Sequence, residues 1–176
     1  MKKDNKPTVT VAISAYNEEK NIVLFLESVL RQKTENLVLE KILVVSDGST
    51  DKTVREARSL KSSLVEVKDY KARTGKATRL NGIYSSLVSD FLVQADADVI
   101  FADIYTIENI IKPMLSDSRV GMCGGNPLPL PAKNFTEKGV NSMFSACLIK
   151  MRKEVKGGDN VFSADGRLLG YRKSLY

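Results

Sequence analysis

The sequence predicts an α/β fold in which a mostly parallel sheet is covered by helices on both faces. Two short, continuously apolar runs, residues 42–45 and 91–95, end in polar residues, as buried strands do. Between such runs lie longer stretches with apolar residues at helical spacing, of which residues 18–32 are the first. Strands and helices that alternate along a chain favour parallel pairing. With 176 residues and 43% apolar content, the chain can bury the core of one such domain.

The remaining elements follow in order along the chain. Strands are predicted from β-branched, alternating or continuously apolar runs at residues 8–13, 42–45, 64–67, 91–95 and 120–124. Helices are predicted at residues 18–32, in the polar stretch that ends at residue 60, and at residues 75–87, 104–115 and 135–155. Between the last strand and the last helix, alternating prolines at 127–131 indicate a stiff, extended connector.

Composition narrows the chemistry. Histidine is absent, which excludes histidine bases and the usual zinc and iron ligand sets, and leaves carboxylates, Lys and Arg, hydroxyls and a hard metal. The net charge of +6 suits an anionic partner. Because Lys and Arg are not grouped with aromatic residues, we expect a phosphate-bearing substrate or an anionic membrane surface and no nucleic acid. Cys123 and Cys147 are interpreted as thiols in a reducing compartment, and no apolar run is long enough for a membrane span.

Two aspartates, Asp96 and Asp98, directly follow the predicted strand at residues 91–95. In an extended segment, side chains two residues apart point to the same side. Two carboxylates on one side suit Mg²⁺ or Mn²⁺ that also takes oxygens from phosphate and water. The alternative is that one aspartate caps the helix that begins near Asp103.

Polar residues also follow two earlier strands, and ligands of open α/β sheets bind beyond the carboxyl ends of the strands. After the first strand, Asn17 either caps the next helix or joins Tyr16 in a pocket for a base and ribose. After the second, Asp47 precedes a glycine, and its carboxylate can accept a base imide or a ribose hydroxyl. Asp51, or a hydroxyl beside it, can cap the following helix. We expect these segments and Asp96–Asp98 to converge on one crevice.

Three cations, Arg73, Lys76 and Arg79, surround the predicted start of the helix at Gly75. Helix N-termini bind phosphate, and cations strengthen that binding. The spacing is not that of a P-loop, so an ATPase or GTPase is not favoured.

Taken in order, these segments resemble an inverting family 2 glycosyltransferase with the GT-A fold. The motifs that carry the resemblance are VAISAYNEE at 11–19, VVSDGSTD at 44–51, GKA at 75–77 with LNG at 80–82, and QADAD at 94–98. A looser similarity continues from Asp165 to Lys173, where the family has its acceptor-side strand.

The resemblance implies a nucleotide-sugar donor, typically a UDP-sugar, and a Mg²⁺ or Mn²⁺ ion. It implies that the nucleoside is held by Ala15, Tyr16, Asn17, Glu18 and Asp47. Lys76 or Arg79 would hold the diphosphate, Asp96 would lie near the ribose or the donor sugar, and Asp98 would ligate the metal. Residues 1–126 would then be the nucleotide-sugar-binding portion, and residues 127–176 the incomplete start of the acceptor-binding portion.

In the family, the base that deprotonates the acceptor belongs to an acidic motif some tens of residues beyond the acceptor-side strand. We therefore expect it beyond Tyr176, with Asp165 as a weaker alternative, and expect this chain to be a donor-binding fragment with little activity alone. The acceptor would be a hydroxyl of a glycan, a lipid or another molecule. We expect a cytoplasmic protein that, at full length, can associate with the cytoplasmic face of a membrane.

Three alternatives remain at this point. A haloacid-dehalogenase-like phosphotransferase also carries two aspartates after a strand, but after its first strand. A sugar nucleotidyltransferase shares the general fold, but its Gly-rich loop after the first strand is replaced here by Tyr16-Asn17-Glu18. The third is a non-catalytic nucleotide-binding module.

Overall fold

The computed structural model describes residues 6–154 and 166–175. The chain forms two compact units, one made of Met1–Gly125 with Gly166–Tyr176 and the other of Asn126–Asp165.

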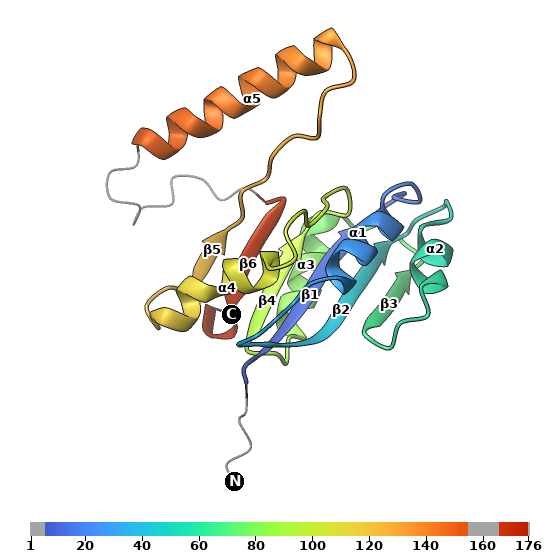
Figure 1. The fold of residues 1–176 in the computed structure, drawn as a ribbon. Helices are drawn as coiled ribbons and strands as arrows, with labels where there is room; N and C mark the ends of the chain where they lie inside the picture. Colours follow the sequence, from blue (N-terminus) through green and yellow to red (C-terminus); the bar gives the residue numbers. More distant parts are fainter. Residues whose placement is uncertain (1–5, 155–165, 176) are drawn as a thin grey trace. The chain divides into compact units, whose positions relative to one another are not determined.

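The larger unit contains a six-stranded sheet with the order β3-β2-β1-β4-β6-β5 (Figure 1). Three of its pairings, β1 with β2, β1 with β4 and β2 with β3, are parallel. The last strand lies between β4 and β5 and is antiparallel to both. This arrangement confirms the predicted α/β class with a mostly parallel sheet. The strands are β1 Thr8–Ala15, β2 Val38–Asp47, β3 Val65–Tyr70, β4 Phe91–Ala95, β5 Met122–Gly124 and β6 Leu168–Arg172.

Helices cover both faces of this sheet, as predicted. The helices are α1 Ile22–Leu30, α2 Thr53–Ser59, α3 Lys76–Ser85 and α4 Thr106–Ser116, with a 3₁₀ turn at Lys173–Leu175. Residues of α1, α2 and α4 contribute to one buried cluster with the strands, whereas α3 contributes to a separate cluster on the opposite face. Figure 1 shows α1 and α4 on one side of the sheet and α3 on the other.

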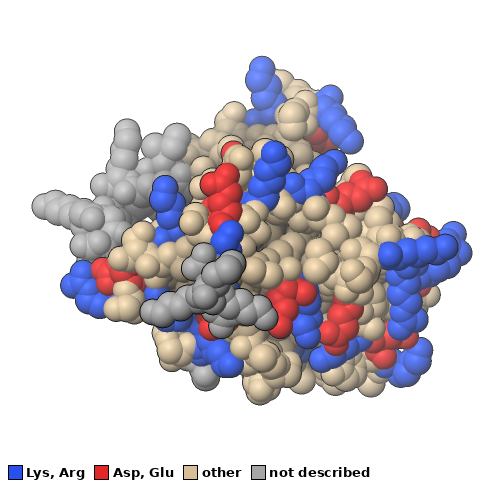
Figure 2. Space-filling model, turned by 60° about the horizontal axis from the view of Figure 1, so that its bottom comes forward, with Lys and Arg blue, Asp and Glu red and all other residues tan. Residues whose placement is uncertain are grey.

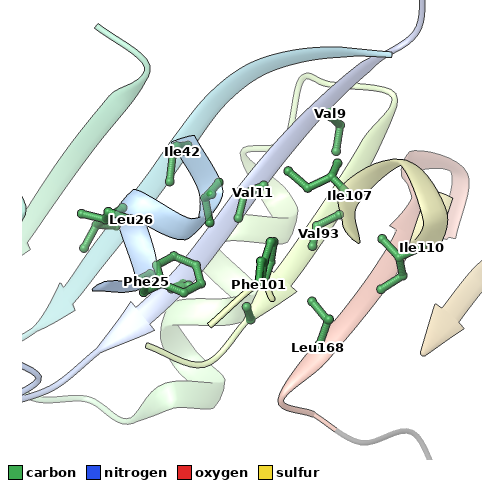
Figure 3. Close-up of a cluster of buried hydrophobic side chains, with 14 of the residues drawn as sticks. Val9, Val11, Phe25, Leu26, Ile42, Val93, Phe101, Ile107, Ile110 and Leu168 are labelled. Carbon is green, nitrogen blue, oxygen red and sulfur yellow. The ribbon is translucent and has the colours of Figure 1, made fainter. Parts of the chain in front are cut away.

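The larger cluster forms where α1 and α4 pack on alternate residues of the strands (Figure 3). Val9 and Val11 of β1 are fully buried there, next in register to Phe91 and Val93 of β4. Phe25 of α1 is also fully buried, with its ring edge-on to Phe101 at 5.8 Å between centroids. Complete burial of such a side chain contributes about 1.5–3 kcal/mol.

The opposite face positions two of the aspartates. Leu43 and Val45 of β2 pack with α3, and Asp47 lies two residues further along the same strand. Gln94 of β4 accepts a hydrogen bond from Tyr84 of α3, and Asp96 follows two residues later. Side chains two residues apart in a strand lie on one face. The strand periodicity therefore directs Asp47 toward the side of the sheet that α3 covers, and its ion pair with Lys76 of α3 places Asp96 there as well, just beyond the end of β4.

The start of α1 differs from the prediction. The helix begins at Ile22 rather than at residue 18, with Asn21 at its N-cap position. Asn17 has φ 56°, outside helical geometry, and its side chain accepts the backbone N–H of Thr50 at 2.8 Å. The capping role for Asn17 is therefore wrong. The reason is a contact with the loop after β2, 33 residues away, which no local pattern encodes.

The smaller unit consists of an extended segment followed by α5, Phe135–Glu154, close to the predicted helix. Two reciprocal hydrogen bonds between Asn134 and Glu137 stabilise the start of this helix. Asn134 Oδ1 accepts the N–H of Glu137 at 2.8 Å, and the side-chain amide of Asn134 donates to the Glu137 carboxylate at 3.0 Å. Among the described residues, no helix has both the length and the apolar character to cross a bilayer. The assignment of donor and acceptor portions to residues 1–126 and 127–176 stays a prediction, although β6 lies within the main sheet.

Candidate functional site

The candidate site lies at the carboxyl ends of β1, β2 and β4, around the N-terminus of α3. Parallel strands bring their carboxyl ends to one edge of a sheet, which is where open α/β folds bind ligands. Tyr16 follows β1, Asp47 ends β2 and Asp96 follows β4. These three segments, together with the start of α3, supply the contacts from which the site is built.

Asp47 fixes the loop that leads into α3. Its carboxylate accepts the backbone N–H groups of Thr74 at 2.9 Å and Gly75 at 2.8 Å, and the Nε–H of Arg79 at 2.7 Å. Asp47 is only 2% exposed. Burial by itself raises the pKa of this carboxyl, but the hydrogen bonds from Thr74, Arg79 and Gly75 outweigh it and hold the pKa below its ordinary value. Asp47 is therefore an ionised anchor inside the protein.

The guanidinium of Arg79 is held on two sides. Besides Asp47, it donates to the carbonyl of Ala72 at 2.5 Å, and its central carbon lies 3.8 Å from the ring centroid of Tyr70. Its side chain is 10% exposed. Of the two cations predicted to hold a diphosphate, Arg79 is the one already neutralised by a buried carboxylate.

Gly48 allows the strand end and the loop before α3 to meet. It has φ +74°, and a Cβ there would lie 2.8 Å from the backbone nitrogen of Arg73. Only glycine fits both the left-handed conformation and this close approach. The Asp47-Gly48 pair in the sequence is thus explained by a backbone contact to the loop of residues 72–75.

The segment after β1 is fixed to the start of α2. Asn17 bonds to Thr50 as described, and the N–H of Glu18 donates to Thr53 Oγ1 at 2.7 Å. The Glu18 carboxylate in turn accepts the amide of Asn21 at 2.7 Å. Ala15, the last residue of β1, is buried. Of the predicted nucleoside-binding residues, Ala15, Asn17 and Glu18 therefore shape this segment through contacts within the protein.

Asp51 joins the same two elements. It accepts the N–H of Thr53, the first residue of α2, at 2.9 Å and the N–H of Glu19 at 3.1 Å, although Lys52 and not Asp51 occupies the N-cap position of α2. Burial raises the pKa of the Asp51 carboxyl, but the hydrogen bonds from Thr53 and Glu19 lower it by more. The loops after β1 and β2 are thereby held together by an ionised carboxylate.

An aromatic–cation stack lies beside this anchor. The guanidinium carbon of Arg73 lies 3.8 Å from the ring centroid of Tyr16. The sequence indicated both residues, but nothing in it paired them, because their contact is long-range along the chain. The stack brings the loop after β1 against the loop before α3.

Asp96 and Asp98, which follow β4, lie in a turn. The expectation that they belong to an extended segment is therefore wrong. The strand ends at Ala95, and the N–H of Val99 donates to the carbonyl of Asp96 at 3.3 Å. Asp96 forms an ion pair with Lys76, the first residue of α3. Asp98 is exposed and forms no hydrogen bond or ion pair with any residue that the structure describes.

The carboxylate pair fits a hard divalent cation that is completed by other oxygens. Within the described part of the chain, no group of three or more carboxylate or thiol side chains could enclose a metal alone. Mg²⁺ and Mn²⁺ accept one or two carboxylates when phosphate oxygens and water fill the remaining positions. Asp96 and Asp98, which lie in one turn, therefore stay the predicted metal ligands. Asp165 lies outside the described residues.

Charge on the surface is mixed. On the face shown in Figure 2, the described Lys and Arg side chains are interspersed with Asp and Glu and do not form one continuous basic band. This face offers no extended cationic groove of the kind that tracks a nucleic-acid backbone.

Comparison with known proteins places these motifs in a family. The family model "Glycosyl transferase family 2" matches residues 10–176. The 4,4'-diaponeurosporenoate glycosyltransferase of Staphylococcus aureus (strain bovine RF122 / ET3-1) is 30% identical over 167 residues, which are 93% of this chain and 41% of that protein. The chain thus spans about two fifths of the length of the curated relatives it matches. The match argues against the phosphotransferase and nucleotidyltransferase alternatives.

Solved structures share the fold. A mannosyltransferase from Pyrobaculum calidifontis, in complex with GDP-Man and Mn²⁺, aligns with a TM-score of 0.70 at 22% identity, over 97% of this chain and 46% of its own. A glucosyl-3-phosphoglycerate synthase from Mycobacterium tuberculosis, in complex with UDP, aligns with a TM-score of 0.66 at 20% identity, over 96% of this chain and 58% of its own.

Proposed function

This chain belongs to glycosyl transferase family 2, and from its site we propose that it binds the nucleoside-diphosphate sugar in a reaction that transfers the sugar to an acceptor hydroxyl. The supporting observation is the meeting of three elements at one edge of the sheet. There, Asp96 pairs with Lys76, the cation at the start of α3, and Asp98 lies in the same turn as Asp96, a combination of charges that suits a metal–diphosphate group.

Each part of the donor has a matching region. The ring of Tyr16 and the guanidinium of Arg73 offer flat surfaces for a base, and the loop fixed by Asp47 keeps them together. Lys76 and the N-terminus of α3 suit the diphosphate. Uracil is our first choice for the base of the donor, and guanine is the alternative, because the structural neighbours were solved with UDP and with GDP-Man.

The proposed transfer is a single displacement with inversion. A bond forms between the acceptor oxygen and the anomeric carbon, while the bond from that carbon to the diphosphate oxygen breaks. The acceptor proton passes to a carboxylate base, and the nucleoside diphosphate leaves with the bonding electron pair. No described residue is assigned as this base, for which Asp165 stays the weaker of the predicted candidates.

A divalent cation held by Asp98 and Asp96 would stabilise the charge that develops on the leaving diphosphate. Mn²⁺ is the ion to test first, since the mannosyltransferase neighbour was solved with it. Lys76 would add a second positive charge on the diphosphate, from the first turn of α3.

Calorimetric titration of the 176-residue chain with UDP and with GDP, with and without Mn²⁺, tests the proposal. We expect binding of one nucleotide that strengthens with Mn²⁺, and loss of that strengthening in Asp98→Asn. Asp103→Asn is the matched control, because Asp103 is a nearby exposed carboxylate that accepts the N–H of Tyr105, and an asparagine oxygen can still do so.

Two results would count against the proposal. Absence of nucleotide binding with and without Mn²⁺ would contradict the donor site. Nucleotide binding that ignores Mn²⁺, in the wild type and in Asp98→Asn alike, would favour a nucleotide-binding module without metal-assisted transfer.

A further inference from the structure

The two aspartates after β4 have different surroundings. Asp96 has a side chain 27% exposed and forms an ion pair with Lys76, whereas Asp98 is exposed and has no partner among the described residues. For a metal that needs both carboxylates, Asp98 is accessible, whereas Asp96 already has a counter-ion in Lys76.

The ammonium group is brought to Asp96 by fixed backbone. Lys76 directly follows Gly75, whose N–H is held by Asp47 at 2.8 Å. The helix start is thus pinned, while the Lys76 side chain remains 47% exposed and can swing on its flexible stem. A cation at a helix N-terminus opposes the helix dipole. The first turn of α3 holds no acidic residue that would compensate, so Asp96 is the carboxylate that offsets this cost.

The other cations near this helix start have other partners. Arg79 is paired with the buried Asp47, and Arg73 lies over Tyr16. Of these three cations, only Lys76 combines contact with the aspartate pair and substantial exposure. It is therefore the one that can exchange its acceptor when a ligand arrives.

We propose that Lys76 acts as a removable counter-ion of Asp96, which makes metal binding depend on the diphosphate. A divalent cation that arrives alone must displace the ammonium from Asp96. When a nucleoside diphosphate arrives with the cation, its oxygens offer the ammonium a new acceptor, so the displacement costs less. Since coupling is reciprocal, the cation strengthens nucleotide binding by the same factor as the nucleotide strengthens cation binding.

This inference rests on the proposed donor site and adds a regulatory contact to it. The test is Lys76→Met, because methionine removes the charge and keeps a helix propensity close to that of lysine. Mn²⁺ binding to the 176-residue chain is measured by electron paramagnetic resonance of free Mn²⁺, first without nucleotide and then with saturating UDP. A half-exposed ion pair is worth little in water, so we expect Lys76→Met to bind Mn²⁺ alone about two- to fivefold more tightly than the wild type. We expect UDP to strengthen Mn²⁺ binding by a smaller factor in the variant.

Lys41→Met is the matched control. Lys41 forms an ion pair with Glu66 at 3.1 Å, with side chains 39% and 43% exposed, and lies on β2 well before Asp47. This variant has the same net charge as Lys76→Met and should bind Mn²⁺ as the wild type does. Equal Mn²⁺ affinity in the wild type and Lys76→Met, or equal tightening in both variants, would overturn the counter-ion role. Failure of the wild type to bind UDP or GDP would instead contradict the donor site, and the comparison without nucleotide would still report on Lys76.

Discussion

Arg79 and Asp47, 32 positions apart in the chain, form an ion pair with 2.7 Å between Nε and Oδ1. Their side chains are 10% and 4% exposed, so the pair lies almost out of water. It joins the end of β2 to the first turn of α3, and the same carboxylate holds the N–H groups of Thr74 and Gly75. The position of the candidate site therefore depends on one buried carboxylate.

Asp47→Ala should lower the free energy of unfolding by about 3–5 kcal/mol, because it leaves a buried guanidinium and two backbone N–H groups without their acceptor. Urea unfolding followed by circular dichroism measures this loss. Asp47→Asn keeps one oxygen acceptor and should lose less. Lys41→Met, which breaks a half-exposed pair, should cost about 0–1 kcal/mol. Equal losses in Asp47→Ala and Lys41→Met would contradict the anchoring role.

Stability should also fall in acid through this carboxyl. Its folded pKa lies below the ordinary value of 3.8, so the folded state releases the proton more readily than the unfolded state does. The stability it contributes is present above 3.8 and is lost as the pH falls through the lower folded pKa. The urea concentration at the unfolding midpoint should therefore fall as the pH is lowered from about 6 to about 3, and it should fall less in Asp47→Asn than in the wild type. If the midpoint falls as much in Asp47→Asn as in the wild type, the acid sensitivity comes from other carboxyls, of which Asp51 is the first candidate.

Gly48→Ala should destabilise the protein by about 2–3 kcal/mol, since the new Cβ meets the backbone of Arg73 at 2.8 Å in a left-handed conformation. Gly82→Ala is the matched control. Gly82 lies inside α3, and a Cβ there would have no atom within 4 Å apart from the backbone of its own helix. Alanine at that position should therefore raise helix stability by about 0.5–1 kcal/mol. Thermal unfolding of both variants provides the comparison, and a neutral Gly48→Ala would rule out the close approach.

If the stack of Tyr16 and Arg73 receives the base, Tyr16→Ala should weaken UDP binding about tenfold, as removal of an aromatic partner does for other stacked bases. Tyr16→Phe keeps the ring and should bind UDP nearly as well as the wild type. Calorimetry in the presence of Mn²⁺ measures both affinities. Similar affinities for Tyr16→Ala and the wild type would place the base elsewhere.

Elements whose pattern is local were predicted closely. The strand at 91–95 has the predicted bounds, and α5 ends within one residue of its predicted end, because continuous apolar runs and helical periodicity are carried by neighbouring residues. The start of α1 was predicted four residues too early, since Asn17 is used by the loop after β2 and not by the helix that follows it. Local capping patterns cannot register such a competing partner.

The candidate site divides in the same way. The sequence marked Tyr16, Asp47, Lys76 and Asp96 as polar residues at strand ends or at a helix start, and the sheet brings all four to one edge. Their pairing was not foreseen. Asp47 was expected to face a ligand, yet its oxygens accept donors from the loop before α3. Its nucleoside role stays a prediction that now has to include these bonds.

The sequence by itself determined the α/β class, the family and the short motifs, because each depends on residue types at close spacing. Only the tertiary structure decided which charges are neutralised within the protein and which remain open. Asp98 has no partner among the described residues, while Asp96 is paired with Lys76, 20 positions away. The physical reason is that an ion pair forms wherever the fold brings opposite charges together, and strand order and helix placement set those distances.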